Sequence, residues 1–353
     1  MARAIADEIS VKVFPVERAH LNRERRVIPE AHQAYLRGRY FWNKRTPDSL
    51  RKSIKQLQEA IQLDPHYALA HAGLADAYAV IGSVFLDSVP PHEAMPKARR
   101  FAEKALELDS SLGEAYVTMA YIRCMYNFDW SGAERIFQRA IAYSPGYSVA
   151  HEWYAIYLAL SGRKKEALNE INRGLDTDPL SLQINTAAIQ VHYFVGDYDR
   201  AIERGLKTLD LDPSFSTARI FLAMAYQKKK MFQKALLEGQ KAAASFSDKT
   251  AILGCIGGCY ASLGKNSEAI KIIKRLRELA KRRYVPSFVF AWIYMHLREK
   301  EKTLEYLEQA YAERSSYLSV IGIEPGMDFL RSDARFTSLQ RKIGLQQHQM
   351  PAT

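Results

Sequence analysis

The sequence predicts an all-α protein, a right-handed superhelix of about eight helix-turn-helix repeats. Three observations predict this class. Apolar residues follow the i, i+3, i+4 spacing of amphipathic helices. Asp-Pro pairs recur along the chain and mark the ends of predicted helices, because proline cannot extend the helix before it. A small residue recurs every 34 positions, at Ala167, Ala201, Ala235, Ala269 and Thr303. Units of this kind bury a core only by stacking on their neighbours.

Other positions keep the same period. A turn residue lies five positions before each small residue and separates the two helices of a unit, because glycine there closes a helix with a positive φ. These turn residues are Gly162, Gly196, Lys230, Gly264 and Arg298. Prolines 145, 179 and 213 and tyrosines 226, 260 and 294 also recur at this spacing. Chance would rarely preserve both spacing and residue type in four registers, so the repeat is real.

The period divides the chain into eight units. They are expected at 31–67, 68–112, 113–147, 148–181, 182–215, 216–249, 250–283 and 284–317. The first and third units have short insertions, and the second has a longer one around 84–91 that predicts a projecting loop. Residues 1–30 are expected to form a helix and linker, 318–345 a segment that caps the last unit, and 346–353 a flexible tail.

The amino-acid composition excludes several classes of protein. The 353 residues include 50 Lys and Arg against 39 Asp and Glu, with 48% apolar and 25% charged side chains. This balance is typical of a globular chain and excludes disorder. No apolar run is long enough to span a membrane. The first residues contain acids where an export signal needs an apolar core, which predicts a cytoplasmic protein.

Several phrases resemble a known family. Leu74-Ala75-x-x-Tyr78, Leu222-Ala223-x-x-Tyr226 and Gly264 with Ala269 resemble the tetratricopeptide repeat, a 34-residue helix-turn-helix unit. Other stretches, at 40–44, 129–134, 150–155 and 329–336, resemble the tetratricopeptide tails of bacterial regulators that carry a winged-helix, cyclase or kinase domain upstream. Residues 4–12 resemble the last helix of a small α/β domain in those relatives, so the upstream effector domain is expected to be absent here.

The resemblance implies that the first helix of each unit lines a concave groove. The residues that it places there are Tyr121, Glu152, Ile156, Thr186, Gln190, Tyr193, Phe194, Ile220, Met224, Phe288 and Trp292. The Lys and Asn that hold a peptide carboxylate in chaperone-binding relatives are missing from these positions, which argues against a chaperone adaptor. Aromatic anchors favour a groove for a peptide or partner protein. The alternative, that several of them belong to the core between repeats, stays open.

A second candidate surface is basic. Residues 228–283 contain 14 Lys and Arg but only four Asp and Glu. An exposed convex stripe is expected from Lys228, Lys229, Lys230, Lys271, Lys274, Arg275, Arg277, Lys281, Arg282 and Arg283. Such a stripe could bind nucleic acid, an anionic surface or an acidic partner. A solvated helix face is the other interpretation.

No catalytic or cofactor site is predicted. Cys255 and Cys259 lie four residues apart but lack two further metal ligands nearby. His151-Glu152 begins a zinc-protease motif, yet Ala155 stands where the second histidine should be. We therefore expect no enzyme activity, no cofactor and no metal. The glycines at 254, 257 and 258 weaken their helix and lead to the hypothesis of a softer joint in the superhelix.

Overall fold

The computed structural model describes residues 27–83, 89–245 and 249–345. The helix expected within 1–30 and the tail 346–353 therefore fall almost entirely outside the described residues, as does most of the loop expected around 84–91. The described residues are helical throughout, with short turns between the helices. None of these helices has the length and apolar character needed to cross a membrane.

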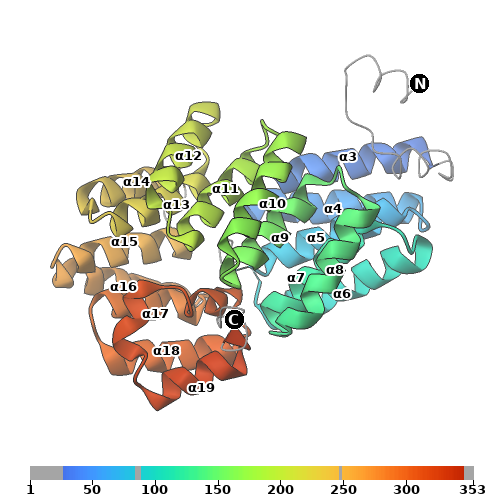
Figure 1. Ribbon diagram of the computed structural model, residues 1–353. Helices are drawn as coiled ribbons and strands as arrows, with labels where there is room; N and C mark the ends of the chain where they lie inside the picture. The colour runs from blue at the N-terminus through green and yellow to red at the C-terminus, as the bar shows by residue number, and fades with distance from the viewer. Residues whose placement is uncertain (1–26, 84–88, 246–248, 346–353) are drawn as a thin grey trace.

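Eight helix pairs follow one another along the described residues and are called repeats 1 to 8 below (Figure 1). They wind into the superhelix that the sequence predicts, so the fold class is confirmed. The pairs are α3 (Pro29–Asn43) with α4 (Pro47–Leu63), α5 (Ala68–Ile81) with α6 (Pro91–Leu108), α7 (Gly113–Tyr121) with α8 (Trp130–Tyr143), α9 (Ser148–Leu160) with α10 (Lys164–Thr177), α11 (Leu182–Val195) with α12 (Tyr198–Leu211), α13 (Ser216–Lys228) with α14 (Phe232–Ser245), α15 (Thr250–Ser262) with α16 (Asn266–Ala280), and α17 (Ser287–His296) with α18 (Lys300–Ala312).

The turns between paired helices share one backbone conformation. Gly162 and Gly196 adopt φ values of 80° and 87°, in the left-handed region that glycine enters without strain. Lys230 and Arg298 stand at the equivalent positions of their repeats and adopt φ values of 58° and 61°. The repeat geometry therefore imposes this turn even where the sequence has no glycine.

The small residue of the 34-residue period lies where the two helices of a repeat cross. Ala167, Ala201, Ala235 and Ala269 are fully buried, and so is Thr303 in the last repeat. The Thr303 hydroxyl donates to the Glu299 carbonyl at 2.8 Å, which satisfies its polar group inside the helix pair. A larger side chain would push the two helices apart.

Repeats 7 and 8 approach each other through glycines of α15. A Cβ atom on Gly257 would lie 2.6 Å from the Ile293 Cδ1 atom, and one on Gly254 would lie 2.8 Å from the Val289 Cγ1 atom. Both distances are shorter than van der Waals contact. Close packing of α17 on α15 accounts for these glycines, and the softer joint suggested from the sequence stays a prediction.

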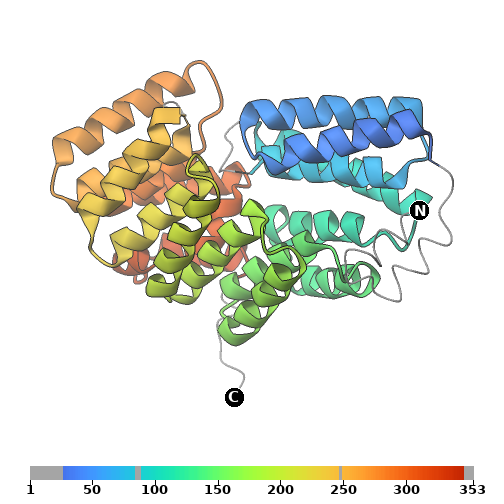
Figure 2. The same cartoon turned by 90° about the horizontal axis from the view of Figure 1, so that it is seen from above.

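After α18 the chain turns back toward earlier repeats. This C-terminal segment contains the 3₁₀ turns η2 (Ser316–Val320) and η3 (Pro325–Leu330) and the helix α19 (Ala334–Lys342). Phe336 of α19 is fully buried. The Trp130 indole, in repeat 3, donates to the Ile343 carbonyl at 2.7 Å. The C-terminal segment thus bridges the end of the superhelix to repeat 3 (Figure 2).

A second contact joins distant repeats. The Gln183 side-chain amide, at the start of α11 in repeat 5, donates to the Asn43 carbonyl at the end of α3 at 2.5 Å. Repeat 1 therefore reaches repeat 5, just as the C-terminal segment reaches repeat 3. These two contacts close the curve of the superhelix around a central space.

Candidate partner-binding pocket on the concave surface

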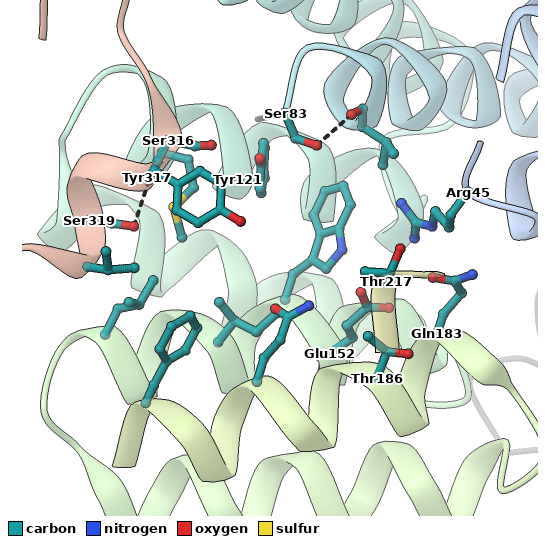
Figure 3. A pocket seen from close by; sticks show the side chains of 18 residues that line it. Arg45, Ser83, Tyr121, Glu152, Gln183, Thr186, Thr217, Ser316, Tyr317 and Ser319 are labelled. Carbon is teal, nitrogen blue, oxygen red and sulfur yellow. Dashed lines mark hydrogen bonds between the residues drawn. The ribbon is translucent and has the colours of Figure 1, made fainter. Parts of the chain in front are cut away.

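A cavity with a volume of about 140 Å³ lies in this central space. The first helices of repeats 2 to 6 contribute its walls, the loop between α3 and α4 contributes Arg45, and residues 316–320 of the C-terminal segment close one side. Figure 3 shows these side chains converging from separate elements. We call this cavity the central pocket.

Helices α9 and α11 form the two longest walls of the central pocket. The side chains that line the pocket change from polar to apolar along each of these helices. On α9, Glu152, Ile156 and Leu160 line it at intervals of four residues, which places them on one helix face. On α11, the lining residues Thr186, Gln190 and Phe194 follow the same spacing. Polar side chains therefore come from the starts of both helices and apolar ones from their ends.

Unpartnered polar atoms gather at the polar end of the central pocket. Arg45 has two buried nitrogens, Nε and Nη2, without a hydrogen-bond partner. Glu152 has one such oxygen, Oε2, and Thr186 has its hydroxyl. Glu152 is 7% exposed and Thr186 is 2% exposed. Buried polar groups in folded proteins are normally paired, so this cluster requires an explanation.

The charges of Arg45 and Glu152 affect each other without forming an ion pair. Burial raises the pKa of the Glu152 carboxyl, and the nearby Arg45 charge and the Trp153 side chain oppose that shift. Burial likewise lowers the pKa of Arg45. Arg45 adopts a φ of 50° and its guanidinium stacks on the Trp42 ring, 3.7 Å from the ring centre. This stacking holds the cation against the pocket wall.

A buried polar network connects repeats 1 to 3 and includes Arg39 of α3. The Arg39 guanidinium donates to Asp76 Oδ2 at 2.9 Å, and the Tyr147 hydroxyl donates to the same oxygen at 2.8 Å. The Thr118 hydroxyl donates to the other Asp76 oxygen. Asp76 is therefore fully satisfied although it is fully buried. The network pairs its own charges, in contrast to Arg45 and Glu152.

The structure brings six of the predicted groove residues together in the central pocket. They are Tyr121, Glu152, Ile156, Thr186, Gln190 and Phe194. The other five, Tyr193, Ile220, Met224, Phe288 and Trp292, line two smaller cavities of about 20 and 40 Å³ farther along the concave surface. Tyr317 of the C-terminal segment lines all three cavities and stacks on Phe288 with ring centres 5.0 Å apart. The protein's own C-terminal segment thus covers this second group.

Glu324 anchors the C-terminal segment on the concave surface. The Tyr193 hydroxyl donates to its Oε2 atom at 3.1 Å, and the Lys228 ammonium pairs with its Oε1 atom. The side chains of Lys228 and Glu324 are only 13% and 3% exposed. Lys228 was expected in the exposed basic stripe, and that expectation is wrong, because its side chain turns inward to neutralise a buried carboxylate.

The remaining basic residues lie at the surface in two places. Lys229 and Lys230 stand at the turn of repeat 6, and Lys229 pairs with Asp199 at 2.9 Å. The others are exposed on α16 or just after it, where Lys271 pairs with Glu268 and Lys281 with Glu278. Those on or just after α16 are Lys271, Lys274, Arg275, Arg277, Lys281, Arg282 and Arg283. Local acids thus neutralise part of the stripe.

Sequence reasoning missed several lining residues of the central pocket. Gln183 and Thr217 lie at the starts of first helices, which the resemblance places along the concave groove, so the register alone could have found them. Arg45 and the residues 316–320 carry no such signal. They reach the pocket only because the superhelix curves back on itself.

The described residues hold no group of three His, Cys, Asp or Glu side chains that could bind a metal ion. The three cysteines, Cys124, Cys255 and Cys259, are buried and form no disulfide. Burial raises the pKa of the Cys124 thiol. This thiol is therefore held in its neutral, unreactive form.

Comparisons with known proteins agree with this architecture. Residues 125–181 match the family model of the tetratricopeptide repeat. Of the solved structures, a monomeric variant of IFIT1 with Gppp-AAAA has a TM-score of 0.55 at 15% identity and covers 84% of this chain and 67% of its own. PilW, a type IV pilus biogenesis factor, has a TM-score of 0.44 at 15% identity, over 64% of this chain and 98% of its own. The chain folds as a tetratricopeptide repeat solenoid.

One curated protein is similar over half of the chain. The transcriptional regulator HilA of Salmonella typhimurium is 27% identical over 176 residues, which are 50% of this chain and 31% of HilA. HilA of Salmonella typhi matches over the same length. The match therefore spans less than a third of HilA. Half of this chain thus resembles part of a bacterial transcriptional regulator.

Proposed function

We propose that this protein is a non-catalytic scaffold that binds a peptide or partner protein on its concave surface, in bacterial regulation or complex assembly. The observation that carries the proposal is the central pocket, where six groove residues predicted from the repeat register meet around one cavity. An aromatic and aliphatic cavity with a few polar groups is the usual anchor of an interface hot spot.

The likeness to HilA supports the regulatory setting, since HilA is a transcriptional regulator. A cytoplasmic location, predicted from the sequence, stays a prediction.

Site-specific photo-crosslinking in bacterial cells tests the proposal. A photoreactive amino acid replaces Gln190, which lines the central pocket, or Lys207, which is exposed on the outer helix of the same repeat. A third position, Lys274, samples the basic stripe. We expect one protein to crosslink at Gln190 and not at Lys207, and we expect Ile156→Glu to abolish that crosslink.

Crosslinks at the two control positions would contradict the proposal. Crosslinks found only at Lys207 would place the partner on the convex surface and overturn it. Crosslinks found only at Lys274, directed to nucleic acid and lost steeply as salt is raised, would favour the basic stripe instead. Circular dichroism of each purified variant checks that the repeats remain folded.

A further inference from the structure

The polar end of the central pocket presents an unused site for a carboxylate. The Arg45 Nε and Nη2 atoms form one edge of the guanidinium plane, and both are buried without a partner. Two parallel N–H donors on one edge match the two oxygens of a carboxylate and hold it in a bidentate pair. The Trp42 ring stacks on the guanidinium and fixes its plane. The edge is therefore preorganised.

The same end presents an unused acceptor for a cation. The Glu152 Oε2 atom and the Thr186 hydroxyl are both buried and unpartnered. An ammonium group has three donors and would satisfy both oxygens at once. Figure 3 shows Arg45, Glu152 and Thr186 on one side of the pocket, together with Gln183 and Thr217. Acceptor and donor residues thus line the same end of the pocket.

The charge balance selects the ligand class. Among the described residues that line the central pocket, Arg45 and Glu152 are the charged ones, so the site is neutral as a whole. A simple anion would be repelled by Glu152, and a simple cation would be repelled by Arg45. A ligand with a carboxylate beside an ammonium group satisfies both side chains and brings no net charge into a buried site.

The opposite end of the pocket selects the rest of the ligand. Its walls include Ile156, Leu160 and Phe194. The volume of about 140 Å³ is close to that of an apolar cavity of ~150 Å³ that accepts a benzene molecule. A small ligand with a short apolar group therefore fits this end of the pocket.

We propose that the central pocket binds a free α-amino acid with a small aliphatic side chain, such as valine or leucine. Its carboxylate pairs with Arg45, its ammonium group binds Glu152 and Thr186, and its side chain lies against Ile156 and Phe194. This inference goes beyond the scaffold proposal and does not depend on it. The purified chain alone, without a partner protein, is sufficient to test it.

Isothermal titration calorimetry of the purified chain with L-leucine and L-valine provides the first test. Two analogues accompany them: 4-methylpentanoate, which lacks the ammonium group, and isopentylamine, which lacks the carboxylate. We expect an amino acid to bind and both analogues to bind about tenfold more weakly or worse, because each leaves one buried charge unpaired. Absence of amino-acid binding at 10 mM, or equal binding of either analogue, would overturn the proposal.

Variants locate the site. Arg45→Gln and Glu152→Gln are each expected to weaken binding about tenfold or more, whereas Lys44→Gln, which removes the exposed neighbour of Arg45, is expected to leave it unchanged. Ile156→Phe keeps both charges and fills the apolar end, so we expect it to reject leucine and still accept alanine. Wild-type leucine affinity in both Arg45→Gln and Ile156→Phe would show that the amino acid binds elsewhere and would overturn the proposal.

Discussion

The Trp130 indole nitrogen donates a 2.7 Å hydrogen bond to the main-chain carbonyl of Ile343, 213 residues farther along the chain. Repeat proteins usually make contacts only between neighbouring repeats. This bond connects the C-terminal segment to repeat 3, and the segment in turn closes one side of the central pocket. The protein's concave surface is thus shaped by a contact that no local repeat pattern contains.

Trp130→Phe is expected to lower the free energy of unfolding more than Trp42→Phe does. Both indoles are almost fully buried, but the Trp42 indole nitrogen has no hydrogen-bond partner. The two substitutions therefore remove similar packing, and only the first also removes a buried hydrogen bond, worth about 1 kcal/mol. Urea unfolding of both variants measures the difference. Equal losses would mean that the bond to Ile343 contributes nothing to stability.

Glu324→Gln is expected to destabilise the protein by about 3 kcal/mol, because it leaves the Lys228 charge buried and unpaired. Adding Lys228→Met to this variant removes the orphaned charge, so the double variant should lose less stability than the two single losses together. A double-mutant cycle in guanidinium chloride measures this coupling. Strict additivity would show that the pair of charges does not act as a unit.

His296→Gln is expected to reduce the loss of stability in acid. Burial, helped by the charges of Lys228 and Arg298, lowers the pKa of His296 to about 3. The unfolded chain takes up this proton near pH ~6.5 and the folded protein does not, so stability is complete above that pH and declines as the pH falls toward 3.

Unfolding curves between pH 7 and pH 4 measure this contribution. The substituted amide can still hydrogen-bond to Gln227 and Ser262, which contact His296 in the protein. His66→Gln removes an exposed imidazole and serves as the control. If His296→Gln and the wild type lose the same unfolding free energy between pH 7 and pH 4, the lowered pKa of His296 does not cause the loss of stability in acid.

Gly257→Ala is expected to destabilise the contact between repeats 7 and 8 by about 1–3 kcal/mol, although alanine is the better helix former. The added methyl would lie 2.6 Å from the Ile293 Cδ1 atom. Combining it with Ile293→Val removes that atom, so part of the loss should be recovered. Thermal unfolding of the three variants measures both effects. A stabilised Gly257→Ala would favour the softer joint that the sequence suggested.

The sequence was sufficient to predict the repeat because the signal is local. The spacing of Ala167, Ala201, Ala235 and Ala269 reflects helix crossings that recur in every unit, and each crossing needs a small side chain. The same register identified six side chains of the central pocket. It did so because the position of a residue within its repeat decides whether the residue faces the concave surface.

The register could not predict what else reaches that surface. Phe288 and Trp292 occupy groove positions, yet they are 3% and 6% exposed because the C-terminal segment covers them. Lys228 belongs to a basic run in the sequence, and a buried carboxylate 96 residues farther along draws it inward. Neither contact follows the 34-residue period, so only the tertiary structure reveals it.

The sequence by itself determined the helical repeats, their turns and the face that each first helix turns inward, because these depend on spacings within one unit or between neighbours. Tertiary structure decided the enclosure of the central pocket and the place of Arg45 beside Glu152. The curvature of the superhelix, summed over several repeats, brings repeat 1 to repeat 5 and the C-terminal segment to repeat 3. Small rotations between repeats accumulate into that curvature, and no single unit specifies the total.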